Sequence, residues 1–291
     1  MQVGRYQIHE TLGVGAHSRV VRGHDPLIDR SVAIKLFSPQ LARGEARTRF
    51  LREARVVGKL SHPCIIAVHD MGIEESTQTP YLVMEMVDGQ SLEKIVSKGS
   101  IPFQTACQWA GHVAEALAVA HSRTVIHGDI KPANILITNE NRVKLTDFGM
   151  ARLASHQVDS AVRGTPAYWC PEQILGRAQD ARSDLFSLGV VLHEMLTGVN
   201  PFAGENIAAV CNQILASAPL PPSRSNPSIP EGLDAIVQSC LIKEPQLRIA
   251  SAESLAEQLF PFARRKAVTP QPVAVPEPTL RSRAARLLRS A

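Results

Sequence analysis

Three polar side chains lie close together in the segment VIHGDIKPANILI, residues 125–137. Asp129, Lys131 and Asn134 are spaced i, i+2 and i+5, and apolar residues flank them on both sides. Polar groups fixed in such surroundings are typical of a functional loop, because burying them without partners is costly. Gly128 stands where a second charge is expected, so the segment is either a working catalytic loop or the relic of one.

A further carboxylate, that of Asp147, indicates a possible metal site. Asp147 stands in TDFGMA, after the hairpin-like ILITNENRVKLTDFG and so at the end of a predicted strand. Together with Asp129 and Asn134 it supplies three oxygen-bearing side chains of the hard kind that Mg²⁺ prefers. Each of them alone is also explained as a turn-forming Asp or Asn.

A lysine and a glutamate are both predicted in apolar surroundings. Lys35 lies in the strand-like VAIKLF, and Glu53 shares one face of a predicted helix (46–60) with Phe50 and Val57. A charge on a core-facing stripe is costly unless it is paired. The sequence therefore predicts a Lys35–Glu53 ion pair. The alternative is that both side chains are solvated and never meet.

Two glycines near the start of the chain offer backbone N–H groups to phosphates. The segment LGVGAHSRV contains Gly13 and Gly15, with Ser18 where a third glycine could stand. Glycine lets the backbone approach a phosphate closely. A Rossmann dinucleotide loop requires a helix directly after the glycines, whereas the strand-like RVVRGHD follows here. An ordinary hairpin turn is the alternative.

Two kinds of structure must position these residues. Residues 5–37 and 65–87 alternate in hydrophobicity like strands, and the chain is mostly helical afterwards. We therefore predict an α+β fold with two lobes and a cleft between them. The small β-rich lobe covers 5–84, the hinge 85–89, and the larger helical lobe 90–262.

Length, charge and cysteine content narrow the class of protein. The 291 residues, 44% of them hydrophobic, suffice for one large domain or two lobes. The net charge of +4 is mild and gives no argument for nucleic-acid binding. Five scattered cysteines without a C-x-x-C motif indicate reduced thiols in a cytoplasmic protein. No stretch approaches the roughly 20 apolar residues of a membrane span, so we predict no transmembrane segment.

Taken in order, the motifs resemble those of the protein kinases, specifically the bacterial members of the eukaryotic-type Ser/Thr kinase family. The chain contains a glycine-rich loop, V-A-I-K, a helix glutamate, H-x-D-x-K-x-x-N, D-F-G and x-P-E. The resemblance covers residues 5–262. It implies the bilobal protein-kinase fold, with one regulatory helix in the small lobe.

The resemblance implies a role for each catalytic residue. Lys35 would bind the α- and β-phosphates of ATP and be held by Glu53. Asp129 would orient and deprotonate the substrate hydroxyl, and Lys131 would neutralise charge on the transferred phosphoryl group.

The resemblance also implies the ligands of metal and nucleotide. Asn134 and Asp147 would hold Mg²⁺ or Mn²⁺. Met84 would form the back of the adenine pocket. The residues implied to contact ATP are Leu12, Gly13, Gly15, Val20, Ala33, Lys35 and the hinge residues Glu85 and Val87, whose backbones would pair with adenine.

Two segments imply Ser/Thr specificity and a protein substrate. Lys131 in DIKPAN and Thr165 in GTPAYWCPE resemble the Ser/Thr branch, and GTPAYWCPE forms the peptide platform in the family. Asp184 resembles the residue that anchors the catalytic loop. Arg248 resembles the partner of Glu172, and all three of these would be scaffold charges.

One departure from the family bears on regulation. Family members usually have Arg at position 128, where it gathers a phosphate from the activation loop. With Gly128 we predict activity that is weakly coupled to phosphorylation of that loop, in which Ser155 and Ser160 are the candidate acceptors. Cys170, which replaces a common Ala, is interpreted as a packed thiol rather than a redox switch.

The last segment, 263–291, is predicted to be a Pro-rich linker and a basic tail. LRSRAARLLRS is interpreted as a solvated tail, or alternatively as a basic amphipathic helix that meets a membrane or a partner. Thr269 and Thr279 border prolines and would suit a phosphothreonine-reading partner after self-phosphorylation. The resemblance also allows a homodimer through the small lobe, which no residue decides.

Rival functions remain beside the kinase. A nucleotide-binding pseudokinase acting as a scaffold would be favoured by loss of Lys35, Asp129 or Asp147, and all three are present. A small-molecule kinase would not need the GTPAYWCPE platform, and a pure interaction module would not need three metal-type side chains. We therefore predict a Ser/Thr protein kinase that uses Mg-ATP and phosphorylates proteins, itself included.

Overall fold

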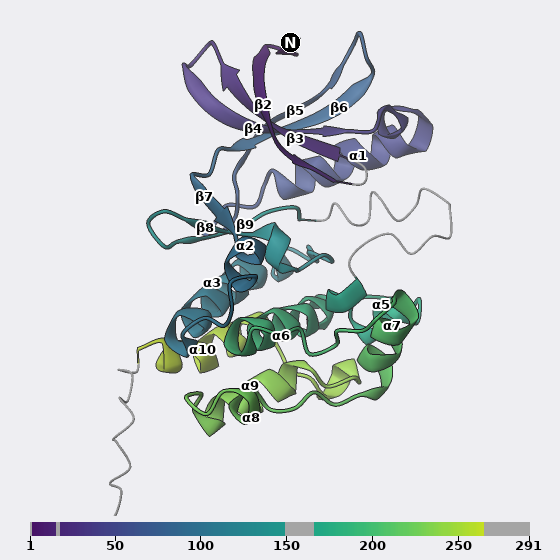
Figure 1. The fold of residues 1–291 in the computed structure, drawn as a ribbon. Helices are drawn as coiled ribbons and strands as arrows, with labels where there is room; N and C mark the ends of the chain where they lie inside the picture. The colour runs from purple at the N-terminus through teal and green to yellow at the C-terminus, as the bar shows by residue number, and fades with distance from the viewer. Residues whose placement is uncertain (1, 16–17, 149–165, 265–291) are drawn as a thin grey trace, which may run out of the picture.

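The computed structural model describes residues 2–15, 18–148 and 166–264. Figure 1 shows two lobes, a curled β-sheet with one long helix above and a group of helices below. We call them the N-lobe and the C-lobe. This architecture confirms the predicted α+β fold with a β-rich lobe followed by a helical lobe.

The N-lobe is built around a six-stranded antiparallel sheet with the strand order β1-β2-β3-β4-β6-β5. Its strands are β1 (Gln2–Val3), β2 (Tyr6–Val14), β3 (Ser18–Asp25), β4 (Arg30–Phe37), β5 (Val68–Glu74) and β6 (Thr79–Glu85). Strand β4 lies between β3 and β6, where Lys35 stands opposite Val20 and Leu82. The sheet therefore holds Lys35 at its centre, and the side chain is only 8% exposed.

Helix α1 (Gly44–Val57), which follows the short 3₁₀ helix η1 (Pro39–Ala42), packs against this sheet. Phe50, Ala54 and Val57 are buried, and the Phe50 ring meets the Phe37 ring edge-on at a centroid distance of 5.2 Å. Burial of this stripe confirms the predicted apolar face of the helix. Glu53 lies within the same stretch and is partly buried.

The C-lobe consists mainly of helices. They are α2 (Leu92–Val96), α3 (Phe103–His121), α5 (Pro171–Ile174), α6 (Ala181–Thr197), α7 (Ile207–Ala216), α8 (Pro222–Ser225), α9 (Glu231–Cys240) and α10 (Ala252–Ala263), with the 3₁₀ turns η2 (Pro132–Asn134), η3 (Pro166–Tyr168) and η4 (Pro245–Leu247). Every residue of α6 from 183 to 193 is buried, as its apolar circumference predicts. Asp180 caps the start of α6 in a capping box, and Gly198 ends it in a left-handed conformation.

A three-stranded sheet lies where the lobes meet, formed by β7 (Gly89–Ser91), β8 (Ile135–Thr138) and β9 (Val143–Leu145). Strands β8 and β9 form the predicted hairpin. The Leu145 N–H donates to the Cys64 carbonyl at 2.7 Å, and the Leu145 carbonyl accepts from the Ile66 N–H at 3.0 Å. Because the catalytic loop precedes β8 and Asp147 follows β9, this small sheet positions both.

Within the described ranges, no helix is both long and apolar enough to cross a membrane. Several residues that the sequence singles out lie outside the described residues: Ser155, Ser160, Thr165, Thr269 and Thr279. The predicted tail is described only at Ala263 and Arg264. The predicted boundaries of the lobes stay predictions.

Candidate active site

The catalytic loop is anchored from below by a buried carboxylate on α6. Asp184, only 1% exposed, accepts hydrogen bonds from the backbone N–H groups of His127 at 2.9 Å and Gly128 at 2.8 Å. The imidazole of His121 lies 2.7 Å from the same carboxylate. These bonds confirm the anchoring role predicted for Asp184 and fix the backbone just before Asp129.

Asp129, Lys131 and Asn134 converge as their spacing predicts. Lys131 Nζ donates to Asp129 Oδ2 at 2.7 Å, and Asn134 Nδ2 donates to the same oxygen at 3.0 Å. Asn134 Nδ2 also donates to the Asp129 backbone carbonyl at 2.8 Å. Among the described residues no donor reaches Asp129 Oδ1, so this oxygen is placed to accept a proton from a substrate.

His127 joins the catalytic loop to the strand end that carries Asp147. Its Nδ1 accepts a hydrogen bond from the Asp129 N–H at 3.2 Å, so its Nε2 carries the proton and donates to the Thr146 carbonyl at 2.8 Å. The ring also lies against Phe148, with a centroid distance of 4.6 Å. His127 is fully buried. It therefore acts as an internal brace between the two carboxylates.

Asp147 pairs with Lys35 across the cleft at 2.7 Å. Burial works to raise the pKa of Asp147, but the charge and hydrogen bond of Lys35, together with His127 and Lys131, outweigh burial and hold the pKa below its ordinary value. The residue has a φ of +69°, an uncommon conformation for a residue with a side chain. Such outliers cluster at functional sites.

Among the residues it describes, the structure does not show the predicted ion pair between Lys35 and Glu53. The ion pair described at Lys35 joins it to Asp147 instead. Glu53 lies on α1, the helix that packs beneath the same strand. The role of Glu53 stays a prediction.

The residues predicted to bind the nucleotide lie on the N-lobe and along the hinge. Gly13 lies near the end of β2, Gly15 follows that strand directly, and the Gly15 N–H donates to the Ser18 carbonyl at 2.8 Å. Leu12 is 46% exposed. The tip of this loop, 16–17, lies outside the described residues.

An apolar cluster unites the predicted adenine-binding residues. Ala33 and Met84 belong to it, and Val20, Val87 and Leu136 on β8 are partly buried against it. Leu136 thus brings C-lobe surface to residues of the N-lobe. The sequence reasoning missed Leu136, although an apolar residue two places after Asn134 at the start of a strand could have indicated it.

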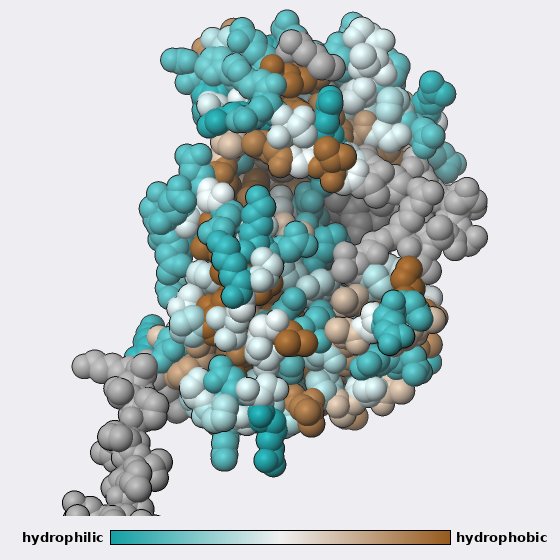
Figure 2. Space-filling model, in the orientation of Figure 1, coloured by the Kyte–Doolittle hydropathy of each residue, from teal (hydrophilic) through white to brown (hydrophobic). Residues whose placement is uncertain are grey.

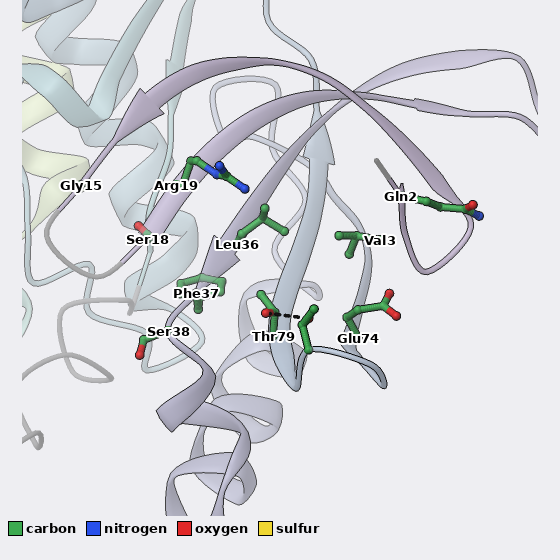
Figure 3. Close-up of a pocket in the computed structure, with 11 residues that line it drawn as sticks. Gln2, Val3, Gly15, Ser18, Arg19, Leu36, Phe37, Ser38, Glu74 and Thr79 are labelled. Carbon is green, nitrogen blue, oxygen red and sulfur yellow. Dashed lines mark hydrogen bonds between the residues drawn. The ribbon is translucent and has the colours of Figure 1, made fainter.

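The surface between the lobes is recessed. Figure 2 shows this recess, with hydrophobic surface along its N-lobe margin. A separate hollow of about 390 Å³ lies on the N-lobe sheet (Figure 3). Its lining includes Val3, Leu36, Phe37 and Glu74, and apart from Gly15 it contains none of the predicted site residues. The active site is therefore identified by the convergence of charged residues and not by this hollow.

The platform after the activation segment rests on a buried ion pair. Arg248 Nη1 and Nη2 each lie 2.6 Å from a carboxylate oxygen of Glu172, and both residues are 4% exposed. Burial works to raise the pKa of Glu172, but the hydrogen bond from Arg248 lowers it below its ordinary value. This geometry confirms the predicted scaffold pair. Cys170 is 1% exposed, and burial raises the pKa of its thiol to about 12, which fits a packed thiol.

The family profile described as "Protein kinase domain" matches residues 6–260. The chain belongs to the protein kinase family. This kinase domain is 41% identical over 264 residues to the serine/threonine-protein kinase PknB of Mycobacterium leprae, a match that covers 88% of this chain and 42% of the relative. It is 38% identical over 273 residues to the serine/threonine-protein kinase PksC of Streptomyces coelicolor, covering 89% and 49%.

The chain spans less than half the length of these relatives. Membership of the family confirms both the resemblance predicted from the motifs and the predicted bilobal fold. It also implies that the domain uses ATP with a divalent metal.

Proposed function

We propose that this chain is an active Ser/Thr protein kinase domain that transfers the γ-phosphoryl group of Mg-ATP to Ser/Thr hydroxyls of proteins, its own included. One observation carries the proposal. Asp129, Lys131 and Asn134 are bonded to one another, while Lys35 and Asp147 face each other across the cleft at 2.7 Å. The names of the relatives support the Ser/Thr class.

Each residue has a distinct task in the proposed reaction. Asp129 receives the substrate hydroxyl at Oδ1, orients its oxygen for attack and accepts its proton. Lys131, which donates a hydrogen bond to Oδ2 of the same carboxylate, neutralises charge on the phosphoryl group during its transfer. Lys35 holds the α- and β-phosphates. Most of the catalysis is therefore positioning and electrostatics.

The donor set fits a magnesium ion. Asp147 contributes a carboxylate whose pKa is held low, and Asn134 contributes an amide oxygen, both hard ligands. Mg²⁺ usually takes only one or two carboxylates from the protein and the rest from phosphates and water. The bound cation would stabilise charge on the β- and γ-phosphate oxygens. Mn²⁺ suits the same oxygen ligands.

The pseudokinase alternative has less support. None of Lys35, Asp129 or Asp147 is lost: Lys35 pairs with Asp147, and Asp129 accepts a hydrogen bond from Lys131. Gly128 leaves the catalytic residues in place and removes only the side chain that would meet a loop phosphate. We therefore propose activity that is weakly coupled to phosphorylation of Ser155 and Ser160.

Several finer proposals accompany this function. We place the domain in the cytoplasm, where ATP is available and its five free cysteines stay reduced. We also propose a homodimer, which the resemblance supports, and a phosphothreonine-reading partner at Thr269 or Thr279, which their neighbouring prolines suggest. Their test is the oligomeric state in solution and binding of the phosphorylated tail.

The deciding experiment is phosphotransfer by purified protein with labelled ATP and Mg²⁺ or Mn²⁺, with and without a generic protein substrate. Asp129→Asn and Lys35→Ala are expected to lose activity by at least about 100-fold. Asp29→Asn is the control, because that side chain is 97% exposed. Absence of label in the parent, despite nucleotide binding, would favour the pseudokinase.

A further inference from the structure

An ion pair joins the hinge to the strand that leads into Asp147. Lys144 Nζ lies 2.7 Å from Glu85 Oε1 and 2.8 Å from Glu85 Oε2, although the two residues are 59 positions apart. Lys144 lies on β9 and Glu85 ends β6. Their side chains are 16% and 30% exposed, so water and salt screen the pair only partly.

Glu85 is fixed by two further hydrogen bonds, and Lys144 is placed by the pairing of β9 with β8. The Ala67 N–H donates to Glu85 Oε2 at 3.3 Å, and the Glu85 N–H donates to the Ala67 carbonyl at 2.9 Å. With its N–H used in this way, Glu85 presents its carbonyl as the backbone group for the predicted contact with adenine. Lys144 stands opposite Leu136, which packs against the same apolar cluster as Val87.

The strand that carries Lys144 continues directly into the metal end of the site. Lys144 is three residues before Asp147, and the Thr146 N–H between them donates to the Asn134 carbonyl at 3.0 Å. A short rigid path therefore runs from Glu85 at the adenine end to Asn134 and Asp147 at the phosphate end.

We propose that Lys144 is a positioning residue for the nucleotide. Its ion pair with Glu85 sets the spacing between the hinge and the Asn134–Asp147 end. A ligand that spans both ends gains affinity from a spacing fixed in advance, whereas a ligand that occupies only the hinge gains little. The inference rests on the proposed function, because it assumes that the nucleotide lies between these two ends.

Binding measurements on matched variants test the inference. The variants are Lys144→Met, Glu85→Gln and the charge exchange Glu85→Lys with Lys144→Glu. Calorimetric titration uses a non-hydrolysable ATP analogue with MgCl₂, and separately adenosine. In each single variant we expect the Kd of the ATP analogue to rise by about 3–10-fold and that of adenosine by less than about 2-fold. The exchange should recover most of the loss.

Arg142→Met is the matched control on the same hairpin. Arg142 pairs with Glu140 at 3.5 Å, but the two side chains are 73% and 63% exposed, so this variant should change neither Kd. In steady-state assays, Lys144→Met should raise the KM for ATP and change kcat by less than about 2-fold.

Three results would overturn the inference. These are equal losses for adenosine and the ATP analogue, unchanged binding in both single variants, or a charge exchange that binds no better than the single variants. A single variant with a lowered melting temperature but an unchanged Kd is an example of unchanged binding. A parent that binds the analogue but transfers no phosphate would refute the proposed function and leave this inference testable, since its readout is binding.

Discussion

Replacing Gly128 by alanine tests what holds the catalytic loop in place. Gly128 has a φ of +75°, a conformation that costs a residue with a side chain about 1–2 kcal/mol. An added Cβ has room, because the nearest atom it would meet is Gln179 Oε1 at 3.6 Å. Against the strain stands the 2.8 Å hydrogen bond from the Gly128 N–H to Asp184. A hydrogen bond to a charged group contributes about 1.5–3 kcal/mol.

The hydrogen bond outweighs the strain, so the loop should keep its backbone conformation in Gly128→Ala. We expect the free energy of unfolding to fall by about 1 kcal/mol and kcat/KM to change by less than about 3-fold. Gly176→Ala is the matched control, since Gly176 has a φ of +65° and no atom within 4 Å of the added Cβ. Urea denaturation and a steady-state phosphotransfer assay compare the two variants.

A large loss of activity would refute this reasoning. If Gly128→Ala lost more than about 30-fold in kcat/KM while its stability matched that of Gly176→Ala, the strain would have moved the loop rather than been absorbed by it. Gly128→Arg extends the comparison, because it adds the same strain and restores the residue usual in the family. Its activity should then depend on Ser155 and Ser160, whereas the parent should stay active when both are alanine.

Three further predictions concern the C-lobe. Burial and, to a smaller extent, the charge of Arg248 lower the pKa of Lys243 from its ordinary 10.5 to about 8. The unfolded chain therefore binds this proton more tightly than the folded protein does. The free energy of unfolding consequently rises as the pH increases from about 8 to about 10.5. Lys243→Met should remove that pH dependence and increase the free energy of unfolding at pH 7 by about 1–2 kcal/mol. Urea denaturation measures this, and a variant less stable than the parent would contradict the prediction. Arg248→Met leaves the Glu172 carboxylate buried without its partner and should lower the free energy of unfolding by about 3–5 kcal/mol in the same measurement. The double variant Arg248→Met with Glu172→Leu should recover most of that loss. Equal losses in the single and double variants would count against the pair. Cys170 should resist iodoacetamide at pH 8 in the folded protein and react in urea, and rapid labelling without urea would show that the thiol is not packed.

Local patterns predicted the features that depend on one element at a time. The stripe of Phe50 and Val57 indicated how α1 packs, and the apolar circumference of α6 indicated a helix buried in the C-lobe. The spacing of Asp129, Lys131 and Asn134 within one loop was enough to predict that they meet. The hydrogen bonds that Asp184 accepts followed from the family resemblance rather than from any local pattern.

Contacts between distant elements could not be predicted in the same way. The sequence offers Lys35 two carboxylates, and only the placement of the strand end relative to β4 puts Asp147 within 2.7 Å. The brace formed by His127 depends on both ring nitrogens having partners in three dimensions. The Lys144–Glu85 pair has no local signal, because both residues read as ordinary strand-end charges.

The charge balance of the site bears on the form in which it takes ATP. Asp129 pairs with Lys131, and Asp147 pairs with Lys35, so the formal charges of these four side chains cancel. A triphosphate carries several negative charges, and moving them into a partly buried site is costly unless cations accompany them. Two lysines that already neutralise two carboxylates provide no surplus positive charge. The residues themselves therefore support binding of ATP as a complex with a divalent cation, for which Asn134 and Asp147 are the proposed ligands.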